Sequence, residues 1–165
     1  MKIQPGLSRF IRERAFALNK TGRHGEVLEC YGAGPPRDAP ELSERTFALD
    51  NLGRHDESLD VCDQYIAENP GDLRGPVTKA SVLYHMGRDS EALDICDRAL
   101  ESDPDHVYAC SLKARILANT GMNAEALDLC SRALDRLPSS DELARLRDSL
   151  TKSTQKPAVQ AMMLD

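Results

Sequence analysis

Three cysteines recur at a spacing of 34 residues, at Cys62, Cys96 and Cys130, and two more lie at Cys30 and Cys110. Thiolates bind metals and carry redox chemistry, so a regular series of cysteines could serve either purpose. However, none of the five forms a CxxC pair. Equivalent residues of packed helices also lie about 10 Å apart, too far for a disulfide or a shared tetrahedral metal. We therefore interpret the series as a buried apolar position repeated by duplication, with reduced thiols and no metal.

The four histidines form no metal-binding or general-base pattern. No two of them have the i, i+4 spacing of one helix face. His24 and His55 each follow a Gly-Arg pair, so duplication explains their positions, and His85 would project from a helix towards a groove. The sequence contains no recognisable set of nucleophile, base and orienting group and no glycine-rich phosphate loop. We expect neither catalysis nor a cofactor.

The charge and hydropathy of the chain exclude two further classes of partner. The net charge is −6, and residues 39–140 contain ten basic against nineteen acidic residues, so nucleic-acid binding is not expected. The first twenty residues include Arg9, Arg12 and Arg14 and no unbroken apolar run, which argues against a signal peptide. No stretch is long enough to span a membrane. Together with unpaired cysteines, these features predict a cytoplasmic protein that does not associate with membranes.

A 34-residue repeat must position these residues. Three segments align without gaps: GRHDESLDVCDQYIAENP from Gly53, GRDSEALDICDRALESDP from Gly87 and GMNAEALDLCSRALDRLP from Gly121. Within each segment the apolar residues follow the i, i+3, i+4, i+7 spacing of a helix, and the proline ends that helix. A second apolar-rich helix precedes each glycine. Each repeat is therefore a helical hairpin that buries its apolar face only by stacking on another copy.

The repeat defines a single all-α domain over residues 1–152, with seven or eight helices that break near the turn glycines. A degenerate hairpin covers residues 8–38, full repeats cover 39–72, 73–106 and 107–140, and a capping helix covers 141–152. Ser139 and Glu142 have the capping-box spacing at the start of this last helix. Residues 153–165 are predicted to be a flexible tail. The apolar cluster of Val159, Met162 and Met163 would let the tail dock on its own chain or form a homo-oligomer.

A glycine at the turn, an alanine five residues later at Ala92 and Ala126, and a closing proline resemble the tetratricopeptide repeat (TPR). The resemblance is strong over residues 39–140 and weaker over 8–38. It implies a right-handed superhelix of antiparallel helix hairpins, whose concave face is lined by the first helix of each repeat and binds peptides or partner proteins. It implies no catalysis. The sequence departs from the family mainly in those first helices, where the early tryptophan is replaced by Leu42, Pro76 and Cys110.

Carried over by matching position, the resemblance places sixteen residues in the partner-binding groove. They are Arg9, Arg12, Phe16, Asn19, Phe47, Asn51, Arg74, Val77, Ser81, Tyr84, His85, Tyr108, Ser111, Arg115, Asn119 and Arg145. Basic residues outnumber acidic ones in this set. The partner segment is therefore predicted to be acidic, held by arginines and anchored on aromatic side chains.

One subclass of the family is excluded by its own motif. Chaperone-adaptor TPR domains grip a C-terminal carboxylate with Lys, Asn, Asn, Lys and Arg at fixed positions. Those positions hold Ser43, Phe47, Thr78, Tyr108 and Leu112 when aligned from the first full repeat. Alignment from the degenerate hairpin does not reproduce the clamp either. We expect a scaffold or adaptor for another protein. The alternatives are a dedicated chaperone for a secreted or assembling substrate and a self-assembling structural protein.

Overall fold

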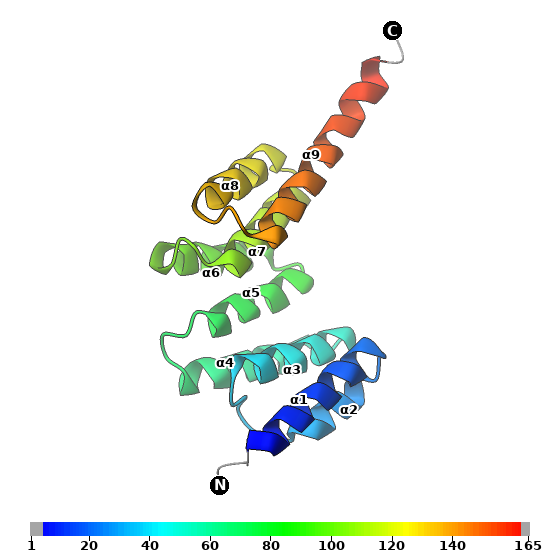
Figure 1. Cartoon of the computed structure of the whole chain (residues 1–165), viewed down its shortest axis with the longest axis vertical. Helices are drawn as coiled ribbons and strands as arrows, with labels where there is room; N and C mark the ends of the chain where they lie inside the picture. The colour runs from blue at the N-terminus through cyan, green and yellow to red at the C-terminus, as the bar shows by residue number, and fades with distance from the viewer. Residues whose placement is uncertain (1–4, 163–165) are drawn as a thin grey trace. The chain divides into compact units, whose positions relative to one another are not determined.

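The computed structural model describes residues 5–162, and side chains within residues 9–153. This part of the chain forms nine α-helices and no strand, so the predicted all-α fold is confirmed, with one or two helices more than expected (Figure 1). The helices are α1 (Pro5–Lys20), α2 (His24–Tyr31), α3 (Ala39–Asn51), α4 (His55–Glu68), α5 (Arg74–His85), α6 (Asp89–Ser102), α7 (Val107–Asn119), α8 (Asn123–Arg136) and α9 (Asp141–Met162).

The chain divides into two compact units, Met1–Arg88 and Asp89–Asp165, where the sequence predicted one domain. In unit 1, α1 packs against α2 and α3 against α4 as hairpins, and α3 also contacts both α1 and α5. In unit 2, α7 packs against α8 as a hairpin, and α6 and α9 both contact α7. The helices that the family resemblance assigns to the concave face are therefore neighbours within each unit.

Each predicted hairpin break is built in the same way. At Gly53 the backbone φ is 71°, a left-handed conformation that favours glycine. The amide of Gly53 donates to the carbonyl of Asp50 (3.0 Å), and the amide of Arg54 donates to that of Leu49 (2.9 Å). This is the Schellman motif, which satisfies the last carbonyls of a helix and reverses the chain. The same pair of hydrogen bonds recurs at Gly22, Gly87 and Gly121.

The apolar stripes of the second helices form the cores. Cys62 packs with Leu42, Val61 and other apolar residues of unit 1, and Cys130 packs with Ala114 and Ala126 in unit 2. Cys62, Cys96 and Cys130 have no exposed surface, as predicted. The alanines at the close-packing positions, Ala92 and Ala126, are also fully buried.

The last helix differs from the prediction. It begins at Asp141 and is capped by Ser140, whose hydroxyl accepts from the amide of Leu143 (3.4 Å), so the expected cap at Ser139 is wrong by one residue. The helix also continues to Met162, ten residues past the predicted end at Lys152. Pro157 lacks an amide hydrogen, but a helix can pass through a proline if it gives up one hydrogen bond. The predicted contacts of Val159, Met162 and Met163 lie outside the described side chains.

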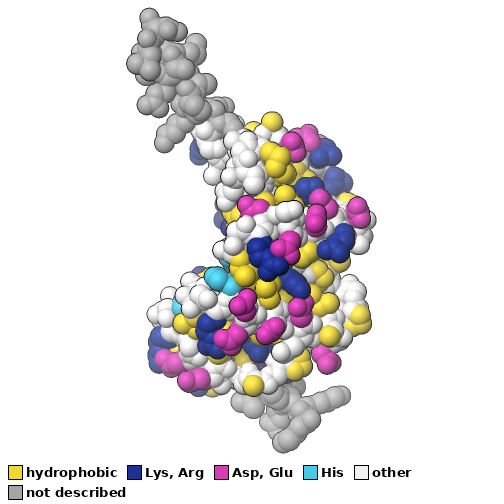
Figure 2. All heavy atoms as spheres, turned by 180° about the vertical axis from the view of Figure 1, so that it is seen from behind, with side chains coloured by type: hydrophobic (Ala, Val, Ile, Leu, Met, Phe, Trp, Pro, Cys, Tyr) yellow, Lys and Arg dark blue, Asp and Glu magenta, His cyan; other side chains and the backbone are white. Residues whose placement is uncertain are grey.

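The surface is mixed in charge. On the face shown in Figure 2, basic and acidic side chains lie close together, and the described atoms form no continuous basic stripe of the kind that follows a phosphate backbone. None of the described helices combines the length and the apolar character needed to cross a bilayer.

Candidate protein-interaction surface

Two half-exposed phenylalanines mark one surface of unit 1. Phe16 on α1 is 54% exposed and Phe47 on α3 is 52% exposed. They border an open pocket of about 260 Å³. The pocket is also lined by Asn19, Lys20, Ser43 and Glu44. Because adjoining exposed aromatic side chains around a pocket are typical of interaction sites, this pair is the strongest candidate anchor in the predicted groove.

A polar contact fixes the two helices that carry the phenylalanines. The side-chain amide of Asn19 donates to the backbone carbonyl of Glu44 (3.1 Å) and to the Glu44 carboxylate. The carbonyl oxygen of the same amide lies 3.0 Å from Nδ1 of His24, and the His24 ring meets Phe47 edge-on at 5.8 Å between centroids. Asn19 is consequently buried. The sequence predicted that Asn19 faces the partner. In the structure its contacts hold together the two helices that form the pocket walls.

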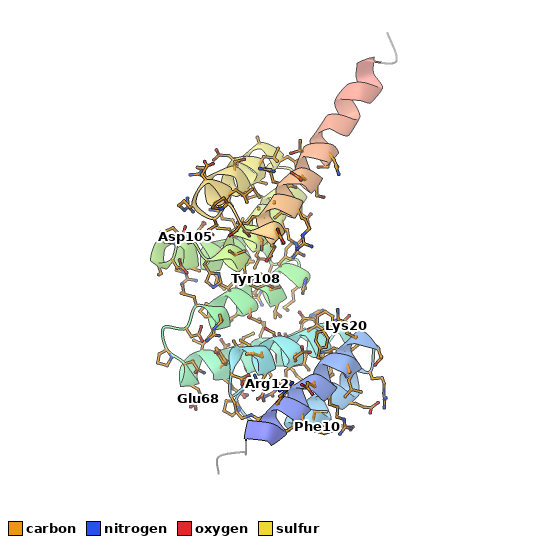
Figure 3. The ribbon with its side chains drawn as sticks, in the orientation of Figure 1. Phe10, Arg12, Lys20, Glu68, Asp105 and Tyr108 are labelled. Carbon is orange, nitrogen blue, oxygen red and sulfur yellow. The ribbon has the colours of Figure 1, made fainter. Side chains whose placement is uncertain are left out.

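Positive charge lies along α1 beside the pocket. Arg12 and Lys20, which are labelled in Figure 3, lie on α1 with Phe16 midway between them in the sequence. The spacing of four residues places all three on one helix face. The ammonium of Lys20 lies 5.3 Å from the centre of the Phe16 ring, a cation–π contact. No carboxylate of the described residues pairs with Lys20. Arg12 lies 3.8 Å from the Asp38 carboxylate. Arg9 is paired instead with Glu13 (2.8 Å).

On α5, the predicted basic contact is already occupied. Arg74 donates from Nη2 to Oδ2 of Asp72 at 2.7 Å and from Nε to Oδ1 at 2.9 Å. The guanidinium of Arg74, helped by the hydroxyl of Tyr65, holds the pKa of Asp72 well below its usual range. The charge of Arg74 is therefore largely compensated within the chain, which makes it a weaker attraction for an acidic partner than the sequence suggested.

One carboxylate joins two histidines in unit 1. Nδ1 of His85 lies 2.9 Å from one oxygen of Asp50, and Nδ1 of His55 lies 3.4 Å from the other. The ring of His85 packs against Tyr84 at 5.8 Å. The amide of Asn51, the next residue of α3, donates to the carbonyl of Phe47 at 2.8 Å. The histidine contacts tie α3 to α4 and α5.

Besides Asn19, three predicted groove residues are buried. Val77 has no exposed surface and belongs to the core, Ser81 is 8% exposed, and Ser111 is 2% exposed. The hydroxyl of Ser111 donates to the Glu142 carboxylate at 2.6 Å and so links α7 to α9. Their burial argues against direct contact with a partner. Successive residues of a helix are rotated by about 100°, and a first helix also packs on its neighbours, so only part of it faces outward.

The remaining predicted residues lie in unit 2. Tyr108, at the start of α7 (Figure 3), is 38% exposed. Arg115, Asn119 and Arg145 are exposed as well. The guanidinium of Arg145 donates to the backbone carbonyl of Asp141. These residues form a second candidate surface, which belongs to unit 2 alone.

The cysteines lack the character of a reactive centre. Burial raises the pKa of Cys62 and of Cys96 to about 12 and that of Cys130 to about 11. No group of three or more His, Cys, Asp or Glu side chains within the described residues is arranged to hold a metal ion. The packing explains the series of cysteines without any chemistry.

The repeats match a known family. The family model of the tetratricopeptide repeat matches residues 51–116 and 87–150, which together span more than half of the chain. The chain belongs to the tetratricopeptide-repeat family. No curated protein sequence matches this TPR chain at a significant level.

Solved structures share the TPR fold at low sequence identity. A thermophilic TPR protein from Thermus thermophilus aligns with a TM-score of 0.71 at 20% identity, over 86% of this chain and 79% of that one. The first TPR domain of Spaghetti (RPAP3), bound to the HSP90 peptide SRMEEVD, aligns with a TM-score of 0.59 at 18% identity, over 73% and 98%. The TPR2B domain of yeast Sti1, in complex with pHsp70, aligns with a TM-score of 0.57 at 22% identity, over 70% and 97%.

Glu44 is a lining residue that is absent from the predicted groove set. It precedes Phe47 by three residues and therefore lies on the same face of α3, a spacing that could have identified it. Its role depends on the Asn19 contact, which joins residues 25 positions apart and has no signal in the sequence.

Proposed function

We propose that this TPR chain is a non-catalytic scaffold or adaptor whose unit 1 binds a segment of another protein at the Phe16–Phe47 pocket. The observation that carries the proposal is the pair of half-exposed phenylalanines, contributed by adjacent inner helices and held around an open pocket. Burying two such rings against a partner removes a large apolar area from water and is typical of interface anchors.

The chemistry of the pocket suggests what the segment carries. Its walls are aromatic, so an apolar side chain enters between the rings. Lys20 at the rim has no carboxylate partner among the described residues, and Arg12 lies on the same helix face. An acidic residue beside the apolar one would pair with Lys20, which increases the association rate more than the affinity. We therefore keep the proposal of an acidic partner, with Lys20 as its main basic contact in place of Arg74.

The structural relatives support a peptide partner for this chain, but the chain lacks the residues of the carboxylate clamp. Spaghetti binds an HSP90 peptide and the Sti1 domain is complexed with pHsp70. In this chain the clamp positions include Phe47, which has no hydrogen-bond donor where the clamp has Asn, and Tyr108, which has no positive charge where the clamp has Lys. We infer that the partner segment is anchored by an apolar side chain and not by a terminal carboxylate.

The cellular setting follows from the thiols. All five cysteines are free, and four of them are buried. We infer that the chain works in the reducing cytoplasm, without a membrane or nucleic-acid partner. A dedicated chaperone would use the same surface to bind a single substrate. Identifying the partner would therefore distinguish a chaperone from a scaffold or adaptor.

A photo-crosslinking phenylalanine analogue tests the surface directly. Placed at Phe47, it should give a covalent adduct to one partner protein in living cells. Placed at Phe10, which is 62% exposed on α1 but does not line the pocket, it should give none. Equal yields of the same adduct from both positions would argue against the pocket as the binding site.

A further inference from the structure

A second cleft opens on unit 1, and no residue of the predicted groove lines it. It has a volume of about 920 Å³ and lies between α2, α4 and the loop over residues 32–38. Its floor is α3, through Arg45 and Leu49, both buried. These two residues lie on the opposite side of α3 from Ser43 and Phe47, because residues two positions apart in a helix point in nearly opposite directions. The cleft is therefore a separate surface from the Phe16–Phe47 pocket.

The charges in the cleft do not cancel. Arg54 and Glu57 neutralise each other through two hydrogen bonds, of 2.6 Å each. Arg45 lies 3.6 Å from Glu41, outside the cleft, and shares this carboxylate with Arg37, which contacts it at 2.7 Å. Glu29 on α2 and Asp60 on α4 are exposed, and neither makes a hydrogen bond or ion pair with a described residue. Two uncompensated carboxylates thus border the cleft, one from each wall.

The floor contains a buried donor without an acceptor. Nη1 of Arg45 donates to the carbonyl of Gly34 at 2.5 Å, but Nε of the same guanidinium has no partner. The Arg45 side chain is only 9% exposed, so bulk solvent has little access to this nitrogen. An acceptor at this point would stabilise the site.

Two glycines that line the cleft leave space beside the main chain. A Cβ atom added at Gly25 or Gly34 would meet no atom within 4 Å. Glycine is therefore not required there by packing, and both residues have negative φ. In α2, alanine in place of Gly25 would favour the helix by up to about 1 kcal/mol. Small residues at these positions permit the close approach of another main chain.

We propose that this cleft binds a basic segment of a partner protein. A lysine or arginine of the segment lies between Glu29 and Asp60, and the aliphatic part of that side chain packs on Leu28 and Val61. A main-chain carbonyl of the segment supplies the acceptor for Nε of Arg45 after a shift of the loop around Gly34. A second copy of this chain is the less favoured occupant, because two copies each carry a net charge of −6.

The test uses the full-length, isotope-labelled chain and two end-capped peptides, one alternating leucine with lysine and the other alternating leucine with glutamate. In an NMR titration the lysine peptide should shift the amides of residues 25–34 and 57–64, with saturation by about 10 mM. Glu29→Lys and Asp60→Lys should each weaken this binding by about tenfold, as expected for reversal of an interface charge. Gly25→Leu should weaken it as strongly without a change in charge.

The matched control is Glu68→Lys, the same charge change at the last residue of α4 (Figure 3). Glu68 does not line the cleft, so this change should alter binding by less than about twofold. Equal binding of the glutamate peptide, shifts centred on Phe16 and Phe47, or no saturable shift would each overturn the proposal. Concentration-dependent shifts of the same residues without any peptide would assign the cleft to a second copy of the chain and overturn it as well.

Discussion

Asn19 on α1 donates hydrogen bonds from one side-chain amide to both the carboxylate and the backbone carbonyl of Glu44 on α3. This contact joins the two helices whose phenylalanines border the candidate pocket. It sets the distance between the aromatic walls, so the binding surface depends on a residue that does not itself need to touch the partner.

Asn19→Ala should destabilise unit 1. The substitution removes both hydrogen bonds to Glu44 and the contact with Nδ1 of His24. It leaves the Glu44 carboxylate without a donor in a half-buried site, at a cost of about 1–3 kcal/mol. Asn51→Ala is the matched control, since that exposed amide makes a single bond to a carbonyl of its own helix and should cost less than about 1 kcal/mol. Urea unfolding followed by circular dichroism compares the two. Equal losses of stability would show that the Asn19 contact has no special role.

Asp72 should make stability depend on pH at the acidic end. The hydrogen bonds from Arg74 and Tyr65 hold its pKa well below the ordinary value. A carboxyl with a depressed folded-state pKa stabilises the fold above its unfolded pKa of about 3.9, and this contribution is lost as the pH falls towards the folded-state value.

Asp72→Asn should therefore be less stable than the wild type by about 1–3 kcal/mol at pH 6, and the difference should shrink at pH 3. Exposed Asp94→Asn should change stability by less than about 0.5 kcal/mol at both values. The measurement is the free energy of unfolding in urea. A difference for Asp72→Asn that grows between pH 6 and pH 3 would contradict the assigned hydrogen bonds.

One of the five thiols should react quickly with an alkylating reagent, and the other four should react slowly. Cys30 is half-buried, whereas the other four cysteines are buried. At pH 8 a thiol with a pKa of about 12 is about one part in ten thousand thiolate, against about one part in four for a free cysteine. Native labelling with iodoacetamide should modify Cys30 first, and Cys30→Ser should abolish the fast phase. Labelling of Cys62 in the native chain at its rate in denaturant would show that the core is misassigned.

The turn at Gly53 should tolerate no side chain without cost. Its φ of 71° lies in the left-handed region, so Gly53→Ala should destabilise the chain by about 1–2 kcal/mol. Gly34→Ala should be neutral within about 0.5 kcal/mol, because its backbone is ordinary and the space around it is open. Thermal unfolding of both variants provides the comparison. Equal stabilities would mean that the Schellman turn at Gly53 is not formed.

Regular spacing allowed the hairpins to be predicted, since one structural unit repeats with one sequence period. The ammonium of Lys79 lies 2.6 Å from Asp63, and Lys113 and Asp97, each 34 residues later, form the same pair. A contact that recurs with the repeat can be inferred from any one copy. The turn glycines and the buried cysteines belong to the same class of feature.

The binding surface was less predictable because it depends on which side of each first helix faces outward. Matching to the family placed Val77 and Ser111 on the exposed side of their helices, although both are buried. The Asn19–Glu44 contact joins the degenerate hairpin to the first full repeat, so it has no counterpart at the 34-residue period. The orphaned donor of Arg45 depends in the same way on the 32–38 loop, which occurs once in the chain.

The measurement that tests the central claim most directly is the affinity of the crosslinked partner for phenylalanine variants, by isothermal titration calorimetry. The double variant Phe16→Ser, Phe47→Ser should bind at least about 30-fold more weakly, because interface aromatic anchors typically contribute about 2 kcal/mol or more. Phe10→Ser removes a similarly exposed ring from the same helix as Phe16 and should bind within about twofold of the wild type. An unchanged affinity of the double variant, with its helical content intact, would contradict the assignment of the partner site to this pocket.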